Sequence, residues 1–380
     1  LSLLNDLWAL SLSGSPDWTQ LAPSGTPPSQ RYAHTAIYDP VRDRMVVFGG
    51  YDNTVGLVND VWSLSLAGSP AWAQLAPSGT PPVAREWHSA IYDPVRDRML
   101  VFGGTDGLNL LGDVWSLALA GGTAWSQVVP TGSPGVRDIH SAIYDPIRDR
   151  MVVFAGGGDS GDLNDVWALS LTGTPAWTQL APTGAPPGAR DSHSAIYDPV
   201  RDRMVIYGGE GGLGAVNDLW SMSLAGIPAW TQLAPTGIVP DPGYSQTAIY
   251  YPSLDRMVIF GGGTTNVLND VHNLTWNSAL GVPPRASAGE LSLAPAYPNP
   301  ARGEASIEFA LPREGAASLR IFDLSGRSVA TLVNGSLAAG HHSIHWDGRE
   351  ASGGLAKPGL YFYELRANGR HLARRLVLMR

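Results

Sequence analysis

The feature that most constrains this chain is a repeat of about 53 residues that runs through its first 280 residues. The phrase His-Thr-Ala-Ile-Tyr-Asp-Pro begins at His34 and recurs, with Ser in place of Thr, at steps of 54, 52 and 53 residues. These copies begin at His88, His140 and His193, and a weaker copy begins at Gln246. Self-similarity at a fixed period is typical of repeat architectures, in which each unit buries its faces against its neighbours.

Two further landmarks recur in register with this phrase. Each copy continues to a short apolar run that ends in a glycine pair, and a phrase of the type Asn-Asp-Val-Trp follows, as at Asn59 to Trp62. The glycine pairs are Gly49-Gly50, Gly103-Gly104, Gly156-Gly157, Gly208-Gly209 and Gly261-Gly262. A second tryptophan stands ten residues after the first, as at Trp72.

Each unit is predicted to form four short strands. The first strand is expected at His34 to Tyr38 and the second at Met45 to Phe48, with a turn between them in which Asp39 bonds nearby backbone. The third strand is expected at positions equivalent to Leu7 to Leu12, and the fourth carries the second tryptophan, as at Trp18. The 45 glycines and 30 prolines also favour many short strands over long helices.

Four strands per unit, with the glycine pair and the tryptophan pair at constant spacing, resemble kelch repeats of the galactose-oxidase-like bacterial type. The resemblance implies that residues 1–280 form a kelch-type β-propeller, an all-β fold with five full repeats and an N-terminal half repeat. The half repeat either completes the fifth blade or belongs to a ring of six or seven blades, and we favour the larger ring. We therefore expect an N-terminal truncation, with a signal peptide upstream of Leu1 that is missing from the chain.

The repeat stops after Trp276, and a different pattern follows a linker at residues 281–290. Residues 291–380 contain short alternating strands and the phrases Tyr297-Pro298-Asn299-Pro300, Trp346-Asp347-Gly348-Arg349 and Pro358-Gly359-Leu360-Tyr361. They resemble the C-terminal sorting domain of type IX secretion substrates and the immunoglobulin-like domain of flagellar hook-capping proteins. The resemblance implies an immunoglobulin-like β-sandwich that engages a secretion machinery, and a bacterial protein that is secreted or held at the cell surface.

The composition excludes several classes of site. Without cysteine the chain forms no disulfide, no thiolate metal site and no Tyr-Cys copper cofactor of the galactose-oxidase kind. A net charge of −8 makes nucleic acid an unsuitable partner. No apolar run is as long as the roughly 18 residues that a membrane span requires. We expect no cofactor.

The candidate ligand site lies where each inner strand begins. An arginine stands three residues before each repeated histidine, and aromatic residues follow some of these arginines. The candidate residues are Arg31, Tyr32, Arg85, Trp87, Arg137, Arg190 and Tyr244. A ring of arginines is suited to a carboxylate or sulfate, and the rings of Trp87 and Tyr32 are suited to stack on a sugar. We therefore expect an anionic or carbohydrate-like ligand, or a protein loop that bears a carboxylate. In the alternative interpretation each arginine forms a salt bridge with a neighbouring acid such as Glu86, Asp138 or Asp191.

Metal binding is not expected. The four repeated histidines are interpreted as structural groups that bond local backbone, because they recur in every unit. His341 and His345 share a strand face but lie about 13 Å apart, too far to bind one ion together. The acidic loop at Asp159, Asp162 and Asp165 does not have the spacing of a calcium loop.

The sequence therefore favours a secreted or cell-surface binding or scaffold protein over an enzyme. Its propeller loops are expected to bind a carbohydrate or a protein at the rim, because the loops after the glycine pairs differ between the copies. Two alternatives remain open. One is a secreted carbohydrate-active hydrolase or lyase with its site in the propeller channel, and the other is a structural surface spacer.

Overall fold

The computed structural model describes residues 3–12, 16–264, 267–276, 291–293, 296, 301–323, 326–367 and 369–379. Among these residues the only helix is a single 3-10 turn, η1 (Pro252–Leu254), so none is long and apolar enough to cross a membrane. The chain divides into two compact units, residues 1–251 with 256–274, and residues 275–380 with 252–255. The predicted linker at 281–290 lies outside the described residues, and the domain boundaries at 280 and 290 stay a prediction.

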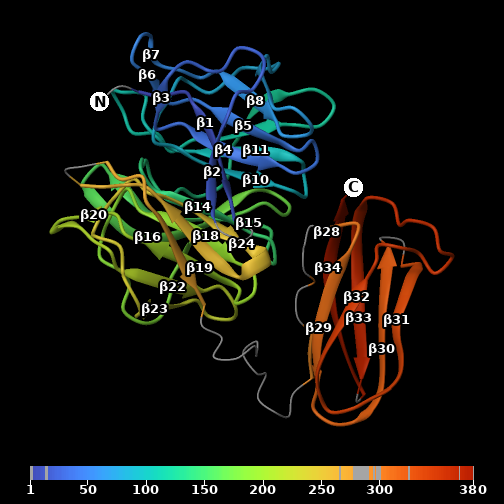
Figure 1. The fold of residues 1–380 in the computed structure, drawn as a ribbon. Coiled ribbons are helices and arrows are strands. Elements are labelled where there is room, and N and C mark those ends of the chain that lie inside the picture. The colour runs from blue at the N-terminus through green and yellow to red at the C-terminus, as the bar shows by residue number, and fades with distance from the viewer. Residues whose placement is uncertain are drawn as a thin grey trace. The chain divides into compact units, whose positions relative to one another are not determined.

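Four sheets of the first unit contain four antiparallel strands each (Figure 1). The first sheet consists of β4 (Thr35–Asp39), β5 (Arg44–Phe48), β8 (Val61–Ser65) and β9 (Ala71–Leu75). The second consists of β10 (Ser89–Asp93), β11 (Arg98–Phe102), β12 (Val114–Ala118) and β13 (Ala124–Val128). The third sheet consists of β14 (Ser141–Asp145), β15 (Arg150–Gly158), β16 (Gly161–Ser170) and β17 (Ala176–Leu180). The fourth consists of β18 (Ser194–Asp198), β19 (Arg203–Tyr207), β22 (Leu219–Ser223) and β23 (Ala229–Leu233). The prediction of four short strands per repeat is confirmed, with the first strand starting one residue later than expected. The fold is a β-propeller.

The remaining two sheets of the ring are shorter. The fifth consists of β24 (Thr247–Tyr251), β25 (Arg256–Phe260) and β26 (Val271–Thr275), and the sixth of β1 (Leu7–Ser11) and β2 (Asp17–Leu21). The half repeat thus forms a sheet of its own and does not complete the fifth blade. The ring centroid of its Trp18 lies 5.0 Å from that of Phe260 in the fifth blade. Ser24, which follows β2, forms a β-bridge with Ala71 of the first blade. The half repeat therefore occupies a sixth position between the fifth and first blades.

Aromatic contacts of this kind recur between neighbouring blades. Three phenylalanine–tryptophan pairs have ring centroids about 5 Å apart: Phe48 with Trp125 at 4.9 Å, Phe102 with Trp177 at 4.9 Å and Phe154 with Trp230 at 5.1 Å. In each pair the phenylalanine ends the second strand of one blade and the tryptophan lies on the fourth strand of the next. The three phenylalanines are fully buried, so the repeated Trp and Phe positions serve to pack one blade on another.

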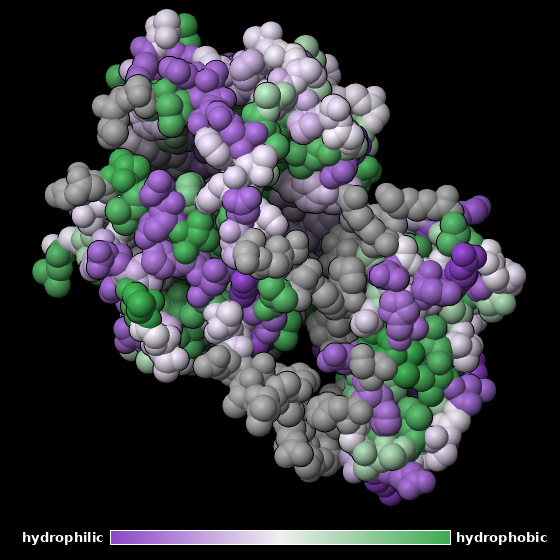
Figure 2. All heavy atoms as spheres, in the orientation of Figure 1, coloured by the Kyte–Doolittle hydropathy of each residue, from purple (hydrophilic) through white to green (hydrophobic). Residues whose placement is uncertain are grey.

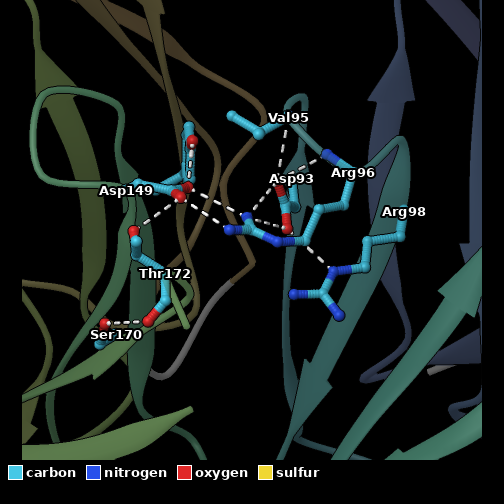
Figure 3. Close-up of polar contacts among 8 residues, drawn as sticks. Asp93, Val95, Arg96, Arg98, Asp149, Ser170 and Thr172 are labelled. Carbon is cyan, nitrogen blue, oxygen red and sulfur yellow. Dashed lines mark hydrogen bonds and ion pairs between the residues drawn. The ribbon is translucent and has the colours of Figure 1, made fainter. Parts of the chain in front are cut away.

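An arginine in the turn after the first strand also joins neighbouring blades. Asp93 is fully buried and its Oδ1 accepts hydrogen bonds from the backbone N–H groups of Val95 and Arg96, as the sequence predicts for this turn. The Arg96 guanidinium donates to Asp93 at 3.0 Å and to Asp149 of the next blade at 2.8 Å (Figure 3). Arg98 Nε donates to Asp93 Oδ2 at 2.8 Å, the same oxygen that accepts the 3.0 Å hydrogen bond from Arg96. Equivalent bridges between blades join Arg42 to Asp97 and Arg148 to Asp202.

The second unit is a two-sheet β-sandwich. One sheet contains β27 (Ser292–Leu293), β29 (Ala305–Leu311) and β32 (Gly340–Trp346). The other contains β28 (Ala301–Arg302), β34 (Arg370–Met379), β33 (Gly359–Ala367), β30 (Gly315–Asp323) and β31 (Ser328–Leu337). Ile307, Phe309 and Leu311 are buried on one face, as their alternation predicts, and pack in one core with Leu319 and Ile321. The phrase Tyr297-Pro298-Asn299-Pro300 lies outside the described residues.

The contacts between blades predict a difference between two equivalent phenylalanines. Phe102→Ala should destabilise the propeller by about 3–5 kcal/mol, because it removes a fully buried ring and leaves a cavity. Phe260→Ala should cost much less, because this ring is 38% exposed beside the two-stranded sixth sheet. Urea unfolding of both variants checks this, and equal losses of stability would contradict the blade arrangement described above.

Candidate binding site at the channel entrance

The first strand of each blade lines the axis of the propeller. Strands β4, β10, β14, β18 and β24 contact one another in this order. Just before each strand, one residue joins a chain of backbone hydrogen bonds that passes from blade to blade. Its links are Trp87 N–H to Ala33 O, Ile139 N–H to Trp87 O, Ser192 N–H to Ile139 O and Ser245 N–H to Ser192 O, at 2.8–3.1 Å. We call this chain the collar; it runs across five blades at the end of the propeller axis where the inner strands begin, which we call the channel entrance.

The collar residues adopt an uncommon backbone conformation. All five have φ between 51° and 59° although none is glycine; they are Ala33, Trp87, Ile139, Ser192 and Ser245. Such left-handed residues are sparsely populated and persist only where the surrounding structure determines them. Here the hydrogen bonds to both neighbouring blades hold the backbone in place, so the residues on either side of the collar are rigidly positioned.

The candidate arginines lie two residues before the collar and are buried. The Arg85 side chain is fully buried and its two terminal nitrogens bond Asp113 Oδ1 at 2.7 Å and Oδ2 at 2.9 Å. It also donates to the Gly103 carbonyl at the glycine pair, at 3.0 Å. Asp113 in turn accepts a hydrogen bond of 2.6 Å from the Trp115 indole. Each blade of this type thus contains an Arg-Asp-Trp bridge that joins the start of the inner strand to the third strand.

The bridge repeats in four blades. The other three are Arg31 with Asp60 and Trp62, Arg137 with Asp165 and Trp167, and Arg190 with Asp218 and Trp220. The salt bridge considered from the sequence is therefore present, but the expected partners Glu86, Asp138 and Asp191 are wrong. The partner is the aspartate of the Asn-Asp-Val-Trp phrase, which lies 28 or 29 residues further along the chain. The fifth blade has Gly243 in place of the arginine.

The bridge sets the ionisation of its aspartate. Burial raises the pKa of Asp113, but hydrogen bonds and charge from Arg85 and the hydrogen bond from Trp115 outweigh it, and the pKa lies below its usual value. Asp60 and Asp218 follow the same pattern. Since each guanidinium is matched to a carboxylate, the arginines stabilise the blades and do not present a free positive surface.

The repeated histidines also join blades. His140 Nε2 lies 2.7 Å from the Ser89 hydroxyl of the preceding blade, and its ring packs edge-on against Phe102. His88 contacts Thr35 and His193 contacts Ser141 in the same way. Burial, followed by the nearby arginine, lowers the pKa of His88 and His193 to about 3, so these imidazoles are neutral. The structural interpretation holds, and each of these three rings also contacts a hydroxyl of the neighbouring blade, which the sequence did not predict.

Carboxylates occupy the position between arginine and collar. Glu86, Asp138 and Asp191 stand there in three consecutive blades, and the sequence analysis considered them only as partners of arginine. Burial raises the pKa of Asp138 to about 6, and the charge of Asp191 adds to this. Burial and the charge of Asp138 raise the pKa of Glu86. Burial also raises the pKa of Asp191, to which the charges of Asp162 and Glu210 contribute. The entrance is therefore acidic.

Aromatic side chains occupy the same rim. Tyr32 holds the position of Glu86 in the first blade, and Trp87 follows Glu86 in the second. Tyr32 is 38% and Trp87 is 37% exposed, and their ring centroids lie 6.4 Å apart. Tyr51 extends this group, 5.4 Å from Tyr32. Tyr244, in the fifth blade, is half-buried and its hydroxyl donates to the Thr264 carbonyl at 3.2 Å.

The loops that vary between repeats begin beside these residues. Tyr32 pairs with Tyr51. Glu86 and Asp191 bridge to the residues that follow the glycine pairs, and Asp138 bridges to Gly157, the second glycine of its pair. Small hairpins stand on two of these loops: β3 (Arg31–Tyr32) with β6 (Tyr51–Asp52) and β7 (Gly56–Leu57), and β20 (Glu210–Gly211) with β21 (Gly214–Ala215). Polar and apolar residues are interspersed over the visible face of the propeller in Figure 2. The distinguishing chemistry of the entrance thus lies in its acids and aromatic rings.

Within the described residues, no group of three or more His, Asp or Glu side chains is arranged to hold a metal ion. His342 lies 2.9 Å from the Ala338 carbonyl and stacks on Phe309, while His345 lies 3.4 Å from Glu304. Asp165, from the acidic loop, is committed to Arg137. Each of these residues therefore has a local partner other than a metal.

Comparison with known proteins identifies similar sequences for both units. Residues 2–136 and 121–279 match the KLHDC2/KLHL20/DRC7 Kelch-repeats domain, and residues 298–370 match the FlgD Ig-like domain. Adagio-like protein 3 of Oryza sativa is 31% identical over 288 residues, which are 71% of this chain and 44% of that protein. Kelch domain-containing protein 3 of Bos taurus is 28% identical over 266 residues, which are 64% of this chain and 66% of that protein. The chain thus spans less than half of the first of these relatives.

Among solved structures, a fungal alcohol oxidase of the AA5 family in complex with copper is similar to this chain with a TM-score of 0.46 and 13% sequence identity. The similarity covers 93% of this chain and 86% of the oxidase.

The Arg-Asp-Trp bridge predicts that Arg85 and Trp87 differ in their effect on stability. Arg85→Ala should destabilise the propeller by about 3 kcal/mol, because it leaves Asp113 half-buried without its cation. Trp87→Ala should leave stability within about 1 kcal/mol, because its ring is partly exposed. Urea denaturation measures both. An Arg85→Ala protein as stable as the wild type would show that the bridge contributes little.

The acidic entrance predicts a pH dependence of stability. The pKa of Asp138 is about 6 in the folded chain and about 3.9 when unfolded, so the folded state binds this proton more tightly. Its contribution to stability is present below about pH 4 and is lost as the pH rises to about 6. The free energy of unfolding of Asp138→Asn should therefore fall less than that of the wild type between about pH 4 and pH 6, as measured by urea unfolding at several pH values. If the two free energies changed with pH in parallel, Asp138 would titrate normally.

Proposed function

Because the chain belongs to the kelch-repeat family over residues 2–279, we propose that it is a binding or scaffold protein with a ligand site at the channel entrance. Kelch-repeat proteins generally bind other proteins. The ligand class proposed here is a protein or a carbohydrate, and the protein itself is bacterial and secreted or held at the cell surface. The observation that carries the proposal is the convergence of exposed aromatic rings, carboxylates and variable loops on one rigid rim.

The rim residues have distinct parts in this proposal. Tyr32, Trp87 and Tyr244 contact the ligand, since aromatic rings supply large contact areas with little loss of conformational freedom. The candidate arginines act indirectly, because their bridges hold the loops from which the aromatic residues project. They are Arg31, Arg85, Arg137 and Arg190. The collar adds to this preorganisation, which lowers the entropic cost of binding.

The proposal is tested by a search for ligands followed by substitution. A glycan array and a screen of surface and secreted proteins from the native host should give a ligand whose affinity falls about tenfold or more in Trp87→Ala. Val129→Ala is a suitable control, because Val129 is 79% exposed and lies outside the rim. Equal binding by wild type and both variants would exclude the entrance as the site.

The C-terminal unit supports the proposed location. It matches the FlgD Ig-like domain, and its sequence resembles the C-terminal sorting domain of type IX secretion substrates. We propose that it directs export or surface attachment through the secretion machinery. Deletion of residues 291–380 should leave the propeller folded but mislocalised when cells of the native host are fractionated. Unchanged delivery of the truncated protein to the surface or medium would contradict this role.

A second candidate function is a carbohydrate-active hydrolase, favoured by the raised pKa of Asp138. A carboxyl group that titrates near 6 beside other carboxyl groups is suited to general acid catalysis. Hydrolysis of glycosides that is lost in Asp138→Asn, while thermal stability is kept, would favour this enzyme over the binding protein.

A further inference from the structure

The acids of the entrance lack the positive partners that the half-buried aspartates of the Arg-Asp-Trp bridges possess. Asp60, Asp113, Asp165 and Asp218 are each matched to an arginine. Among the described residues, no ion pair with arginine or lysine involves Glu86, Asp138 or Asp191. The three stand on neighbouring blades and raise the pKa of one another in succession, Asp138 that of Glu86 and Asp191 that of Asp138. Like charges placed this way are unfavourable unless a cation joins them.

Glu86 provides an independent sign that a partner is absent. Glu86 is only 6% exposed, and its Oε2 atom is buried without a hydrogen-bond donor. A hydrogen bond with the Tyr32 side chain lowers the pKa of the Glu86 carboxyl group, but burial and the charge of Asp138 outweigh it. A buried acceptor without a donor costs free energy, and the cost is larger for an ionised group. The free oxygen is therefore set up to accept a hydrogen bond from a ligand.

The aromatic rings define what kind of donor fits. Trp87 follows Glu86 in the sequence, and Tyr32 holds the equivalent position in the preceding blade. The ring centroids of Trp87 and Tyr32 lie 6.4 Å apart, and both rings are partly exposed. The face of an indole or phenol ring attracts cations, and it attracts the flat guanidinium group best because that group also stacks. A guanidinium further offers parallel N–H donors to a carboxylate. An ammonium group is more strongly hydrated and cannot stack.

We propose that the channel entrance binds an arginine side chain presented by a protein partner, with the guanidinium donating to Glu86 and lying against Trp87 and Tyr32. This inference rests on the proposed binding function and names its ligand. It replaces the anionic ligand expected from the sequence, because the arginines of the rim are already neutralised inside the blades. The net charge of −8 favours approach of a basic partner.

The test uses the full chain and three short peptides: acetyl-Gly-Arg-Gly-amide, the same peptide with citrulline, which is a neutral isostere of arginine, and the same peptide with lysine. The chain is labelled with 5-fluorotryptophan, and the ¹⁹F signal of Trp87 is assigned by its loss in Trp87→Phe. The arginine peptide should shift this signal in a saturable way. The citrulline peptide should bind at least tenfold more weakly, and the lysine peptide should fall between them.

Two variants separate the carboxylate from general charge effects. Glu86→Gln should weaken binding of the arginine peptide at least tenfold, and it keeps an acceptor for the Tyr32 hydroxyl. Glu308→Gln removes the same charge from an exposed position in the second unit and should bind like the wild type. Asp138→Asn should weaken binding as well, which covers the case that Glu86→Gln fails to fold.

The inference is overturned if the citrulline peptide binds as well as the arginine peptide, or if Glu86→Gln and Asp138→Asn bind like the wild type. The proposed function fails differently. If a glycan or protein ligand binds at the rim and depends on Trp87 but not on Glu86, the entrance is a binding site and only its arginine specificity is wrong. If no ligand of any kind depends on Trp87, the site itself is wrong.

Discussion

The bridge between arginine, aspartate and tryptophan inside four of the blades is the interaction on which the rest of the propeller depends. It joins the start of the inner strand to the third strand and to the glycine pair, as Arg85 does with Asp113 and Gly103. A paired and hydrogen-bonded guanidinium is one of the few ways to bury an arginine at an acceptable cost. Since the bridge fixes the residues on both sides of the arginine, it also fixes the collar and the rim. Structure and proposed function therefore begin from the same contact.

The contacts between blades are equally regular, and they use different residues. His140 contacts the Ser89 hydroxyl near the axis, and Phe102 packs against Trp177. At the turn, Arg96 donates hydrogen bonds to Asp93 of its own blade and to Asp149 of the next. The fifth and sixth sheets keep only part of this set. Gln246 replaces the histidine, Gly243 replaces the arginine, and Phe260 is partly exposed. This part of the ring is therefore the least strongly packed, which contrasts with the fully buried Phe102 and Phe154 in the middle of the repeat array.

The sequence predicts the strands well because their signals are local. Alternation, the Asp-Pro turn and the glycine pairs lie within a few residues of the strands that they define, and the strand limits agree to within one residue at β4 and β5. The ion-pair partners are harder to predict, because Arg85 and Asp113 are 28 residues apart and each has acidic or basic residues closer in the sequence. The constant spacing of arginine and aspartate in four repeats is the signal that identifies the pair. The collar depends on contacts between blades, so no single repeat contains the information that Glu86, Asp138 and Asp191 meet at one entrance.

The most direct test of this account is a ¹³C NMR titration of the individual aspartate and glutamate carboxyl groups. The account predicts two separate classes. Asp60, Asp113 and Asp218 should titrate below the usual range because an arginine holds each of them ionised, while Glu86, Asp138 and Asp191 should titrate above it, with Asp138 near 6. If both classes titrated together at ordinary values, the arginines would be free of the blade aspartates and the entrance would not be acidic.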